Sequence, residues 1–256
     1  MARKDFQGRR VWITGATSGI GAALATELLR RGASVAASGR NSAALQALAV
    51  SQAPGHVLTL PFDVTDRAAN HAAAESIREA WGGLDVAIFN AGTCEYVDVA
   101  AFDAALFQRQ LDTNVMSLVY GIEAALPLLR ESDRPLLAGM SSLSALKGLP
   151  RASAYGASKA AIRNLLESLR LDLLPAGIPV VTILPGFVRT PLTERNDFPM
   201  PFQLDADAAA RRIADGLERE THEIAFPWQL SLPLRLAALL RSAWVTPLLA
   251  KMVRTS

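Results

Sequence analysis

Short apolar runs alternate with longer amphipathic segments from Arg10 to about Phe226. The apolar runs predict seven β-strands: Val11–Ile13, Ser34–Ser38, Val57–Phe62, Leu84–Phe89, Leu136–Met140, Val180–Leu184 and His222–Phe226. Polar and apolar positions hardly alternate within them, which is typical of strands whose two faces are both covered. Helical segments between the strands, such as Gly19–Arg31, imply right-handed βαβ crossovers. The pattern predicts an α/β fold, a single domain with a doubly wound parallel sheet and helices on both faces.

The segment from Trp228 to Met252 departs from this rhythm. It is rich in leucine, contains two tryptophans and carries the cations Arg235, Arg241 and Lys251. Pro233 and Pro247 interrupt it, so we expect a broken helix rather than one continuous helix. No apolar run reaches the ~20 residues needed to cross a bilayer. We expect one domain over residues 1–226 and an apolar helical extension of it over residues 227–256.

Composition narrows the class of protein. The 256 residues are half apolar and carry a net charge of +2, which is too small to suggest nucleic-acid binding. The single cysteine, Cys94, excludes an internal disulfide and a multi-cysteine metal site, and no metal is expected. The polar start lacks the apolar core of a signal peptide, so a cytoplasmic protein is expected. Only four of the 26 basic residues are lysines, so a lysine in a candidate site stands out.

A glycine-rich turn, Thr14 to Gly21, joins the first strand to the first helix. Small residues let the backbone approach a pyrophosphate, and the helix N-terminus offers it unpaired N–H groups and partial positive charge. The glycines are spaced G-x-x-x-G-x-G, a variant of the dinucleotide-binding fingerprint. A purely structural turn is the alternative, but its place between a strand and a helix favours a Rossmann-type nucleotide-binding domain.

The second strand ends at Gly39, where an NAD site would carry an acidic residue for the ribose hydroxyls. Arg40 follows, and its guanidinium could grip a 2′-phosphate. This pair favours NADP(H) over NAD(H). The alternative is that Arg40 is a solvated residue at a helix start, and Asn41 is expected to cap that helix.

Polar residues also follow the third and fourth strands. Asp63 comes after the third, and Asn90-Ala91-Gly92 after the fourth. Ligands bind at the carboxyl ends of strands in such sheets. Taken singly, Asp63 could cap the helix beginning near Asp66, and Asn90 could form a turn. Together they line one edge of the predicted sheet.

Ser142 follows the fifth strand, and Tyr155 and Lys159 lie in the next helix. Residues four apart share a helix face, so the two side chains can point to one place. A neighbouring ammonium stabilises a phenolate and should lower the pKa of Tyr155. Ser142 can donate a hydrogen bond to a substrate oxygen. Alone, such a Tyr–Lys pair arises often by chance, but here it follows a predicted dinucleotide turn.

At this point the sequence resembles a short-chain dehydrogenase/reductase of the classical type, over residues 8 to about 226. The resemblance rests on T-G-x-x-x-G-I-G at Thr14–Gly21, N-A-G at Asn90–Gly92, Asn114, Ser142, Y-x-x-x-K at Tyr155–Lys159 and P-G-x-x-x-T at Pro185–Thr190. Their joint occurrence in order and at family spacing is highly specific. Phe89 replaces the first asparagine of the family's N-N-A-G, a change that should not affect the chemistry.

The resemblance implies a catalytic tetrad. Tyr155 would be the general acid/base, and Lys159 would lower its pKa and hold the nicotinamide ribose. Ser142 would donate to the substrate oxygen, and Asn114 would support a water that links Lys159 to solvent. The residues expected at the cofactor are Gly15, Ser18, Gly19, Ile20, Gly21, Arg40, Asp63, Val64, Asn90, Ala91, Gly92, Tyr155, Lys159, Pro185, Gly186, Val188 and Thr190. Val188 and Thr190 would orient the nicotinamide carboxamide.

The family's substrate pocket lies between the loop after the fifth strand and the segment after Pro185-Gly186. Here these segments contribute mostly apolar side chains: Leu143, Leu146, Leu149, Phe187, Leu192, Phe198, Met200 and Phe202. They predict a bulky or lipophilic carbonyl compound, although several could be core residues instead. Cys94 could also line the pocket, with a buried, inert thiol as the alternative.

We expect a small-molecule partner and no nucleic acid. The resemblance implies a homodimer or homotetramer formed through the helices that contain Asn114 and Tyr155. The apolar tail has three interpretations: packing against core or another subunit, a lid over the pocket, or peripheral contact with a membrane.

The leading hypothesis is an NADP(H)-dependent oxidoreductase that interconverts a carbonyl and an alcohol. A catalytically idle NADP(H)-binding sensor or interaction protein on the same fold is the alternative from another class. An enzyme of the same fold that performs epimerisation or dehydration is disfavoured, because the chain has no separate substrate domain.

Overall fold

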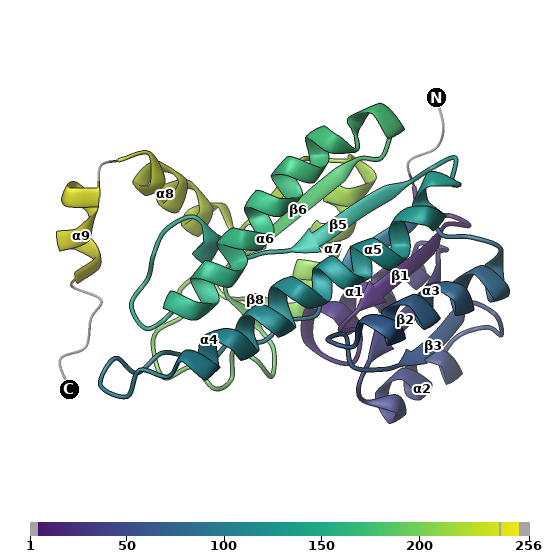
Figure 1. Ribbon diagram of the computed structural model, residues 1–256, viewed down its shortest axis with the longest axis horizontal. Helices are drawn as coiled ribbons and strands as arrows, with labels where there is room; N and C mark the ends of the chain where they lie inside the picture. The colour runs from purple at the N-terminus through teal and green to yellow at the C-terminus, as the bar shows by residue number, and fades with distance from the viewer. Residues whose placement is uncertain (1–4, 241, 251–256) are drawn as a thin grey trace.

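A computed structural model describes residues 5–240 and 242–250. Its main sheet has seven parallel strands in the order β3-β2-β1-β4-β5-β6-β9 (Figure 1). The strands are β1 (Arg10–Thr14), β2 (Ser34–Gly39), β3 (Val57–Pro61), β4 (Val86–Phe89), β5 (Leu136–Met140), β6 (Val180–Pro185) and β9 (Glu223–Phe226). β7 (Val188–Arg189) and β8 (Leu204–Asp205) form a separate short ladder. The predicted doubly wound α/β fold is confirmed, and each predicted strand ends within two residues of the observed one.

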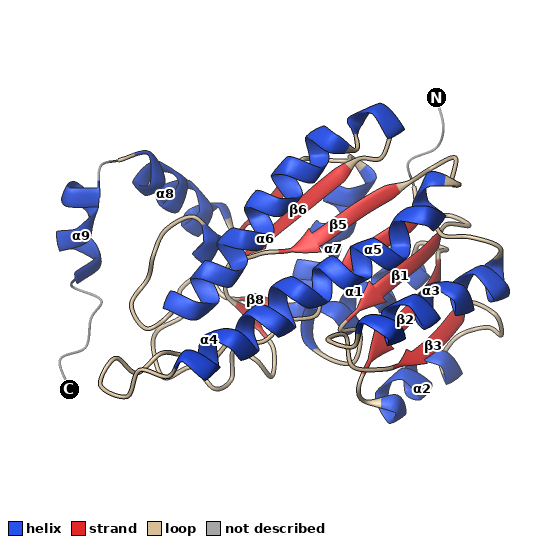
Figure 2. Ribbon diagram, viewed as in Figure 1, coloured by secondary structure: helices blue, strands red, loops and turns tan. Residues whose placement is uncertain are grey.

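Helices cover both faces of this sheet (Figure 2). The helices in the described residues are α1 (Gly19–Arg30), α2 (Ser42–Val50), α3 (Arg67–Trp81), α4 (Ala104–Leu111), α5 (Ser117–Arg130), α6 (Ser153–Asp172), α7 (Ala206–Glu218), α8 (Trp228–Leu239) and α9 (Ser242–Ala250). Short turns of other types occur at η1 (Asp112–Met116), η2 (Leu143–Ala145) and η3 (Leu174–Ala176). α1 packs against α7 on one face, and α3 packs against α5 on the other.

The absence of alternation in the strands has a direct structural reason. In β1, Val11 and Ile13 belong to the core beneath α1 and α7, while Trp12 between them belongs to the opposite core. All three side chains are fully buried. Because helices cover both faces, each position of a central strand must be apolar.

The caps follow the sequence closely. Asn41 accepts a hydrogen bond from the Ala44 N–H at 3.1 Å and caps α2, as predicted. Asp66 accepts one from the Ala69 N–H and caps α3. The alternative that Asp63 caps this helix is therefore wrong, because Asp66 fills that position.

The strand order reverses between β1 and β4, which are hydrogen-bonded neighbours. From β1 the chain runs outward to β2 and β3, and it then returns to β4, β5, β6 and β9 on the other side. The loops that follow β1 and β4 separate there and leave a crevice at the carboxyl edge. The predicted motifs follow β1, β4, β5 and β6, so the topology brings them to this one edge.

The tail forms two helices, α8 and α9, which confirms the predicted broken helix. α8 ends at Leu239 and α9 begins at Ser242, whereas Pro233 and Pro247 are inside the helices. The expectation that the prolines set the break was wrong, since each proline removes one hydrogen bond that its helix tolerates here. Arg241, Lys251 and Met252 lie outside the described residues. No helix among the described residues is both long and apolar enough to cross a membrane.

Candidate active site

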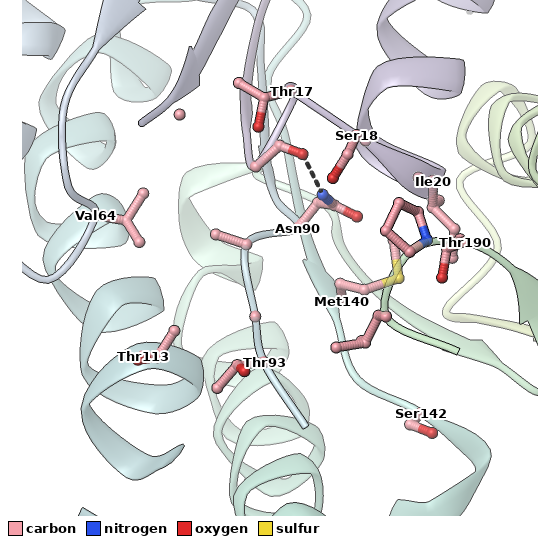
Figure 3. A pocket seen from close by; sticks show the side chains of 18 of the residues that line it. Thr17, Ser18, Ile20, Val64, Asn90, Thr93, Thr113, Met140, Ser142 and Thr190 are labelled. Carbon is pink, nitrogen blue, oxygen red and sulfur yellow. Dashed lines mark hydrogen bonds between the residues drawn. The ribbon is translucent and has the colours of Figure 1, made fainter. Parts of the chain in front are cut away.

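A cavity of about 530 Å³ opens at the carboxyl edge of the sheet. In Figure 3, Ser18 and Asn90 lie toward one end of it and Ser142 toward the other. The predicted site residues that line it are Gly15, Ser18, Gly19, Ile20, Gly21, Arg40, Asp63, Val64, Asn90, Ala91, Gly92, Ser142, Tyr155, Lys159, Pro185, Gly186, Val188 and Thr190. Asn114 is the one predicted site residue that does not line it. Loops distant in sequence therefore converge on a single elongated cavity.

The glycine-rich turn forms the floor of one end. Gly15 has a φ of +69°, a left-handed conformation that side chains disfavour. A Cβ on Gly21 would collide with the carbonyl oxygen of Gly15, so α1 can begin this close to the turn only with glycine there. Ser18, the N-cap, makes no side-chain hydrogen bond to the first turn of α1. The N–H groups of this turn remain available to an anion, which fits the diphosphate of a dinucleotide.

Asn90 joins the two strands at the switch point. Its amide Nδ2 donates to the carbonyl oxygens of Thr14 and Gly15 at 3.1 and 3.2 Å. In return, the Thr14 hydroxyl accepts from the backbone N–H groups of Asn90 and Ala91. Asn90 is thus more than a turn former. Thr14, which sequence reasoning placed in the motif but not in the site, holds β1 and β4 in register beneath the cavity.

Arg40 lies at the rim of the same end with 83% of its side chain exposed. Its nearest carboxylate is Asp63, with 4.0 Å between Arg40 Nη1 and Asp63 Oδ2. Asp63 instead accepts hydrogen bonds from the N–H and hydroxyl of Thr65, and the backbone donor chiefly lowers the pKa of Asp63. Arg40 therefore has only a weak ionic partner and keeps its donors free for a ligand.

Tyr155 and Lys159 occupy adjacent turns of α6, and both line the cavity. Lys159 Nζ lies 5.7 Å from the centroid of the Tyr155 ring. Only 4% of Lys159 is exposed, and its ammonium donates to the Met140 carbonyl at 2.9 Å. Burial lowers the pKa of Lys159 from 10.5 to about 8, because charge is costly away from water.

Burial also raises the pKa of Tyr155 above its ordinary value of 10.0, and a hydrogen bond with Ser142 opposes this rise. The expected lowering by Lys159 is therefore not the dominant effect in this structure. The physical reason is that the protein desolvates the phenol while the ammonium of Lys159 is directed to Met140. Tyr155 is accordingly neutral at pH 7, which is the form a general acid requires.

Two adjacent serines have different surroundings. Ser142 caps the η2 turn by accepting from the Ser144 N–H at 3.2 Å, and its own hydroxyl is 3.5 Å from the Pro185 carbonyl. That donor contact is long, so the hydroxyl can turn to a better acceptor. Ser141 instead donates to the Lys159 carbonyl at 2.7 Å and fixes α6 against β5. Sequence reasoning identified Ser142 and gave no role to Ser141.

Asn114 is fully buried behind the cavity in the π-helical turn η1. Its Oδ1 accepts from the Thr93 N–H at 2.7 Å, and its Nδ2 donates to the Ser158 hydroxyl at 2.9 Å. A Cβ on Gly92 would lie 3.0 Å from Asn114 Oδ1 and 3.2 Å from Lys159 Nζ. The two side chains therefore approach the same point beside Gly92. π-Helical turns are frequent at functional sites, and this one aims Asn114 toward Lys159.

Three segments meet on the substrate side. The Tyr96 hydroxyl donates to Asn196 Oδ1 at 2.8 Å, and the Tyr96 ring packs edge-on against Phe198 at 5.5 Å. Arg151 pairs with Asp197 at 2.9 Å and lies over the Tyr96 ring. These contacts hold the segment after β7 against the loop after β4. Tyr96 and Asn196 were not predicted, because no motif marks them.

The predicted substrate-wall residues are placed unevenly. Leu192 lines the cavity, and Phe187 packs against Phe198 with 6.1 Å between ring centroids. Leu143 is buried, whereas Phe202 is exposed and faces solvent. Cys94 is half-buried, is not among the residues lining the cavity, and has its pKa raised by burial.

Several cavity-lining residues were missed by sequence reasoning. They are Thr17, Phe62, Thr65, Thr93, Thr113, Met140, Ser141, Pro191, Thr193 and Arg195. Most of them directly adjoin a predicted site residue in the sequence. The signal that could have identified them was therefore their place in the same loops that follow the strands. Among residues 5–240 and 242–250, no group of His, Cys, Asp or Glu side chains is arranged to hold a metal ion.

Comparisons with known proteins agree with this geometry. A family model described as short chain dehydrogenase matches residues 9–198. The chain is 39% identical over 238 residues to an uncharacterized oxidoreductase of Myxococcus xanthus, covering 92% of this chain and 94% of that one. It is 31% identical over 218 residues to an uncharacterized oxidoreductase of Staphylococcus haemolyticus, covering 85% and 94% of the two chains.

Solved structures show the same fold. A short chain dehydrogenase from Burkholderia cenocepacia in complex with NADP superposes with a TM-score of 0.83 at 25% identity, covering 95% of this chain and 98% of that one. A short chain dehydrogenase/reductase from Burkholderia phymatum in complex with NAD gives a TM-score of 0.83 at 22% identity, covering 95% and 96%. This second likeness shows the fold alone.

The family model spans most of the chain and includes the turn, Asn114, Ser142 and the Tyr155–Lys159 pair. The sheet order and the cavity at its carboxyl edge match the fold of the solved relatives. This chain therefore belongs to the short-chain dehydrogenase/reductase family, whose members are NAD(P)-dependent oxidoreductases that act on CH–OH/C=O pairs.

Proposed function

We propose that this protein interconverts a bulky or lipophilic carbonyl compound and the corresponding alcohol with NADP(H). One observation carries the proposal: Ser142, Tyr155 and Lys159 meet in the cavity whose other end is the N-terminus of α1. Acid/base groups and an anion-binding helix end thus share one elongated space. A dinucleotide in this cavity would bring its reactive ring to the acid/base groups.

The residues at the α1 end fit a phosphorylated dinucleotide. The glycine turn gives backbone access to a diphosphate, and the exposed Arg40 offers its guanidinium beside the adenosine end. Gly39 stands where a carboxylate would repel a 2′-phosphate. These features support a preference for NADP(H) over NAD(H).

The chemistry follows from the surroundings of each side chain. A nicotinamide bound here supplies the hydride for reduction of the carbonyl carbon, or accepts it in the reverse reaction. In reduction, Tyr155 donates its phenolic proton to the carbonyl oxygen, and in oxidation its phenolate takes the proton back. Ser142 donates a hydrogen bond that fixes the same oxygen. The ammonium of Lys159 offsets the negative charge of the phenolate formed in reduction, and Asn114 supports a proton path past Gly92.

The surroundings of the acid/base groups favour an apolar substrate. Leu192 lines the cavity. Phe187 lies in sequence between the lining residues Gly186 and Val188, and its ring packs with Phe198, which packs with Tyr96. Apolar surface of this kind offers area to a hydrocarbon or ring.

We also propose a cytoplasmic setting, which supplies NADPH, and a homodimer or homotetramer formed through α6, which contains Tyr155, and the helical segment that contains Asn114. Burial of these helices against a second copy would rigidify the segment that carries Tyr155 and Lys159. Sedimentation velocity measures the assembly, and a monomer at micromolar concentration would contradict this part of the proposal.

The test of function is a cofactor-consumption screen. Lipophilic ketones and aldehydes are compared with small charged carbonyl compounds, using NADPH and NADH in parallel and the corresponding alcohols with NADP and NAD. We expect turnover chiefly with NADPH and lipophilic carbonyls. Tight NADPH binding without turnover of any compound would favour the idle sensor instead.

A further inference from the structure

The outward face of the C-terminal helices is apolar. Of the fourteen exposed large apolar side chains in the described residues, six lie within residues 228–244: Trp228, Leu232, Leu236, Leu239, Leu240 and Trp244. The spacing of four between the first three places them on one face of α8. Trp228 is 66% exposed, Leu239 84% and Trp244 65%. We call these six exposed residues together the α8 stripe, and they form an unusually apolar surface for contact with water.

The opposite side of α8 is attached to the body of the protein. Ser231 is buried, and α8 contacts β9 and η2. Glu223 accepts from Arg235 on α8 and from Arg163 on α6, each at 2.8 Å. Packing on that side therefore holds the stripe outward, and Arg235, three residues after Leu232 and four before Leu239, lies on the exposed face beside it. Figure 1 shows α8 and α9 at one end of the molecule.

The C-terminal segment differs in net charge from the rest of the chain. Residues 224–256 contain four cations, Arg235, Arg241, Lys251 and Arg254, and no acidic residue. The remaining 22 cations and 24 acids give residues 1–223 a net charge of −2. The acid that faces α8, Glu223, is offset by its two arginine partners. The stretch of sequence that carries the exposed leucines and tryptophans is thus the cationic part of the chain.

We infer that the α8 stripe binds an anionic lipid surface. Exposed leucines can enter the boundary between headgroups and acyl chains, and tryptophans favour that depth. The cations of the same stretch of sequence attract anionic headgroups, and this stretch contains no acid to repel them. A second copy of this chain is a poorer fit, because it would bring the same positive segment against itself.

The start of α8 lies next to the substrate side of the cavity. A Cβ on Gly186 would meet Pro227 Cδ at 3.0 Å, Leu230 Cδ1 at 3.1 Å and Leu143 Cδ1 at 3.3 Å, so the start of α8 packs against the wall of the cavity. A bilayer under α8 would lie near the substrate side of the site. If the proposed reduction of lipophilic carbonyls holds, the substrate can be taken from the bilayer. Vesicle binding itself does not depend on that activity.

The test is flotation of the full chain with vesicles of phosphatidylcholine plus phosphatidylglycerol, compared with pure phosphatidylcholine. The variant Leu232→Glu/Leu236→Glu places charge in the stripe. Val50→Glu/Val99→Glu is the matched control, because these valines are 76% and 81% exposed and lie outside α5, α6 and the C-terminal helices. Circular dichroism and sedimentation velocity of each variant report its folding and mass.

We expect the unaltered protein to float with the anionic vesicles and its binding to weaken with added salt. The stripe variant should bind at least ~10-fold more weakly and the control variant as the unaltered protein does. Failure of the unaltered protein to bind either vesicle overturns the inference. Equal loss of vesicle binding in both variants also overturns it. If sedimentation shows that the stripe variant dissociates a dimer, and the unaltered protein does not bind vesicles, the stripe is a subunit interface and the inference is wrong. Trp228→Phe/Trp244→Phe should abolish the vesicle-induced shift in tryptophan emission.

Discussion

Burial shifts the pKa values of the two central residues, Tyr155 and Lys159, in opposite directions. It raises the pKa of Tyr155 and lowers that of Lys159 to about 8. Both shifts favour the neutral form, because the protein interior solvates charge poorly. Tyr155 is therefore held as an acid, while Lys159 titrates close to neutral pH. The pair is matched to proton donation at neutral pH and loses its positive member first as pH rises.

The titration of Lys159 can be measured directly. The chain contains four lysines, Lys4, Lys147, Lys159 and Lys251, so ¹³C-lysine NMR gives few resonances to assign. We expect one resonance to titrate near pH 8 and to vanish in Lys159→Arg. A Lys159 that keeps the ordinary value of 10.5 would contradict the effect assigned to burial.

The same shift predicts the pH dependence of carbonyl reduction. Below about pH 8 Lys159 is charged, and above it the ammonium that offsets the forming phenolate is lost. The value of kcat/KM should therefore fall as pH rises through about 8, because kcat/KM reports ionisations of the free enzyme. A profile that rises through this range would contradict the account.

Arg40 has a separate prediction, on cofactor selectivity. Arg40→Ala removes a guanidinium from the cavity rim and should weaken NADPH binding about tenfold, while NADH binding changes less than about twofold. The exposure of Arg40 keeps the expected loss modest. Arg219→Ala, an exposed arginine outside the cavity, is the control. Equal effects on both cofactors in fluorescence titrations would remove the argument for NADP(H).

Among the elements, the turn before α1 is the most constrained. Gly21→Ala would drive a methyl group into the Gly15 carbonyl and the Asn90 amide. We expect it to lower the free energy of unfolding by about 1–3 kcal/mol and to weaken cofactor binding. Gly148→Ala is the matched control, because no atom lies within 4 Å of the added Cβ. If urea unfolding showed the two variants to be equally stable, the close approach of α1 to the turn would not be needed.

Elements with a strong periodic signal could be predicted from the sequence. β5 was predicted to the residue, because Leu136–Met140 is a short apolar run with clear limits. The tail was less predictable, since Pro233 and Pro247 were expected to end helices that in fact include them. The packing of α8 against β9 sustains a helix that local sequence disfavours.

Site residues could be predicted where a local sequence motif marks them and could not be predicted where only folding brings them together. Gly15 and Ser142 were predicted because they closely follow strands, and Lys159 was predicted because it lies one helical turn from Tyr155. Tyr96 and Asn196 meet only through folding, from positions 100 residues apart, so no local pattern could reveal them. The raised pKa of Tyr155 likewise depends on how much protein surrounds the phenol, which spacing does not specify.

At the scale of the whole molecule, the crevice at the carboxyl edge holds the acid/base groups, and the C-terminal helices carry the exposed apolar surface. The reversal of strand order between β1 and β4 opens the cavity, and the two cores on either side of the sheet hold its walls. The C-terminal helices leave this body with an apolar outward face beside the substrate side of the cavity. The protein therefore carries an oxidoreductase site beside an apolar surface that suits anionic lipid.

The most direct test of the central claim is the Tyr155→Phe variant, measured for both turnover and cofactor binding with a substrate found in the screen. Phenylalanine keeps the ring and removes only the proton-bearing hydroxyl. We predict a fall in kcat of at least ~10²-fold with NADPH affinity within about twofold of the unaltered protein. Turnover that survives the loss of the hydroxyl would contradict the assignment of Tyr155 as the acid.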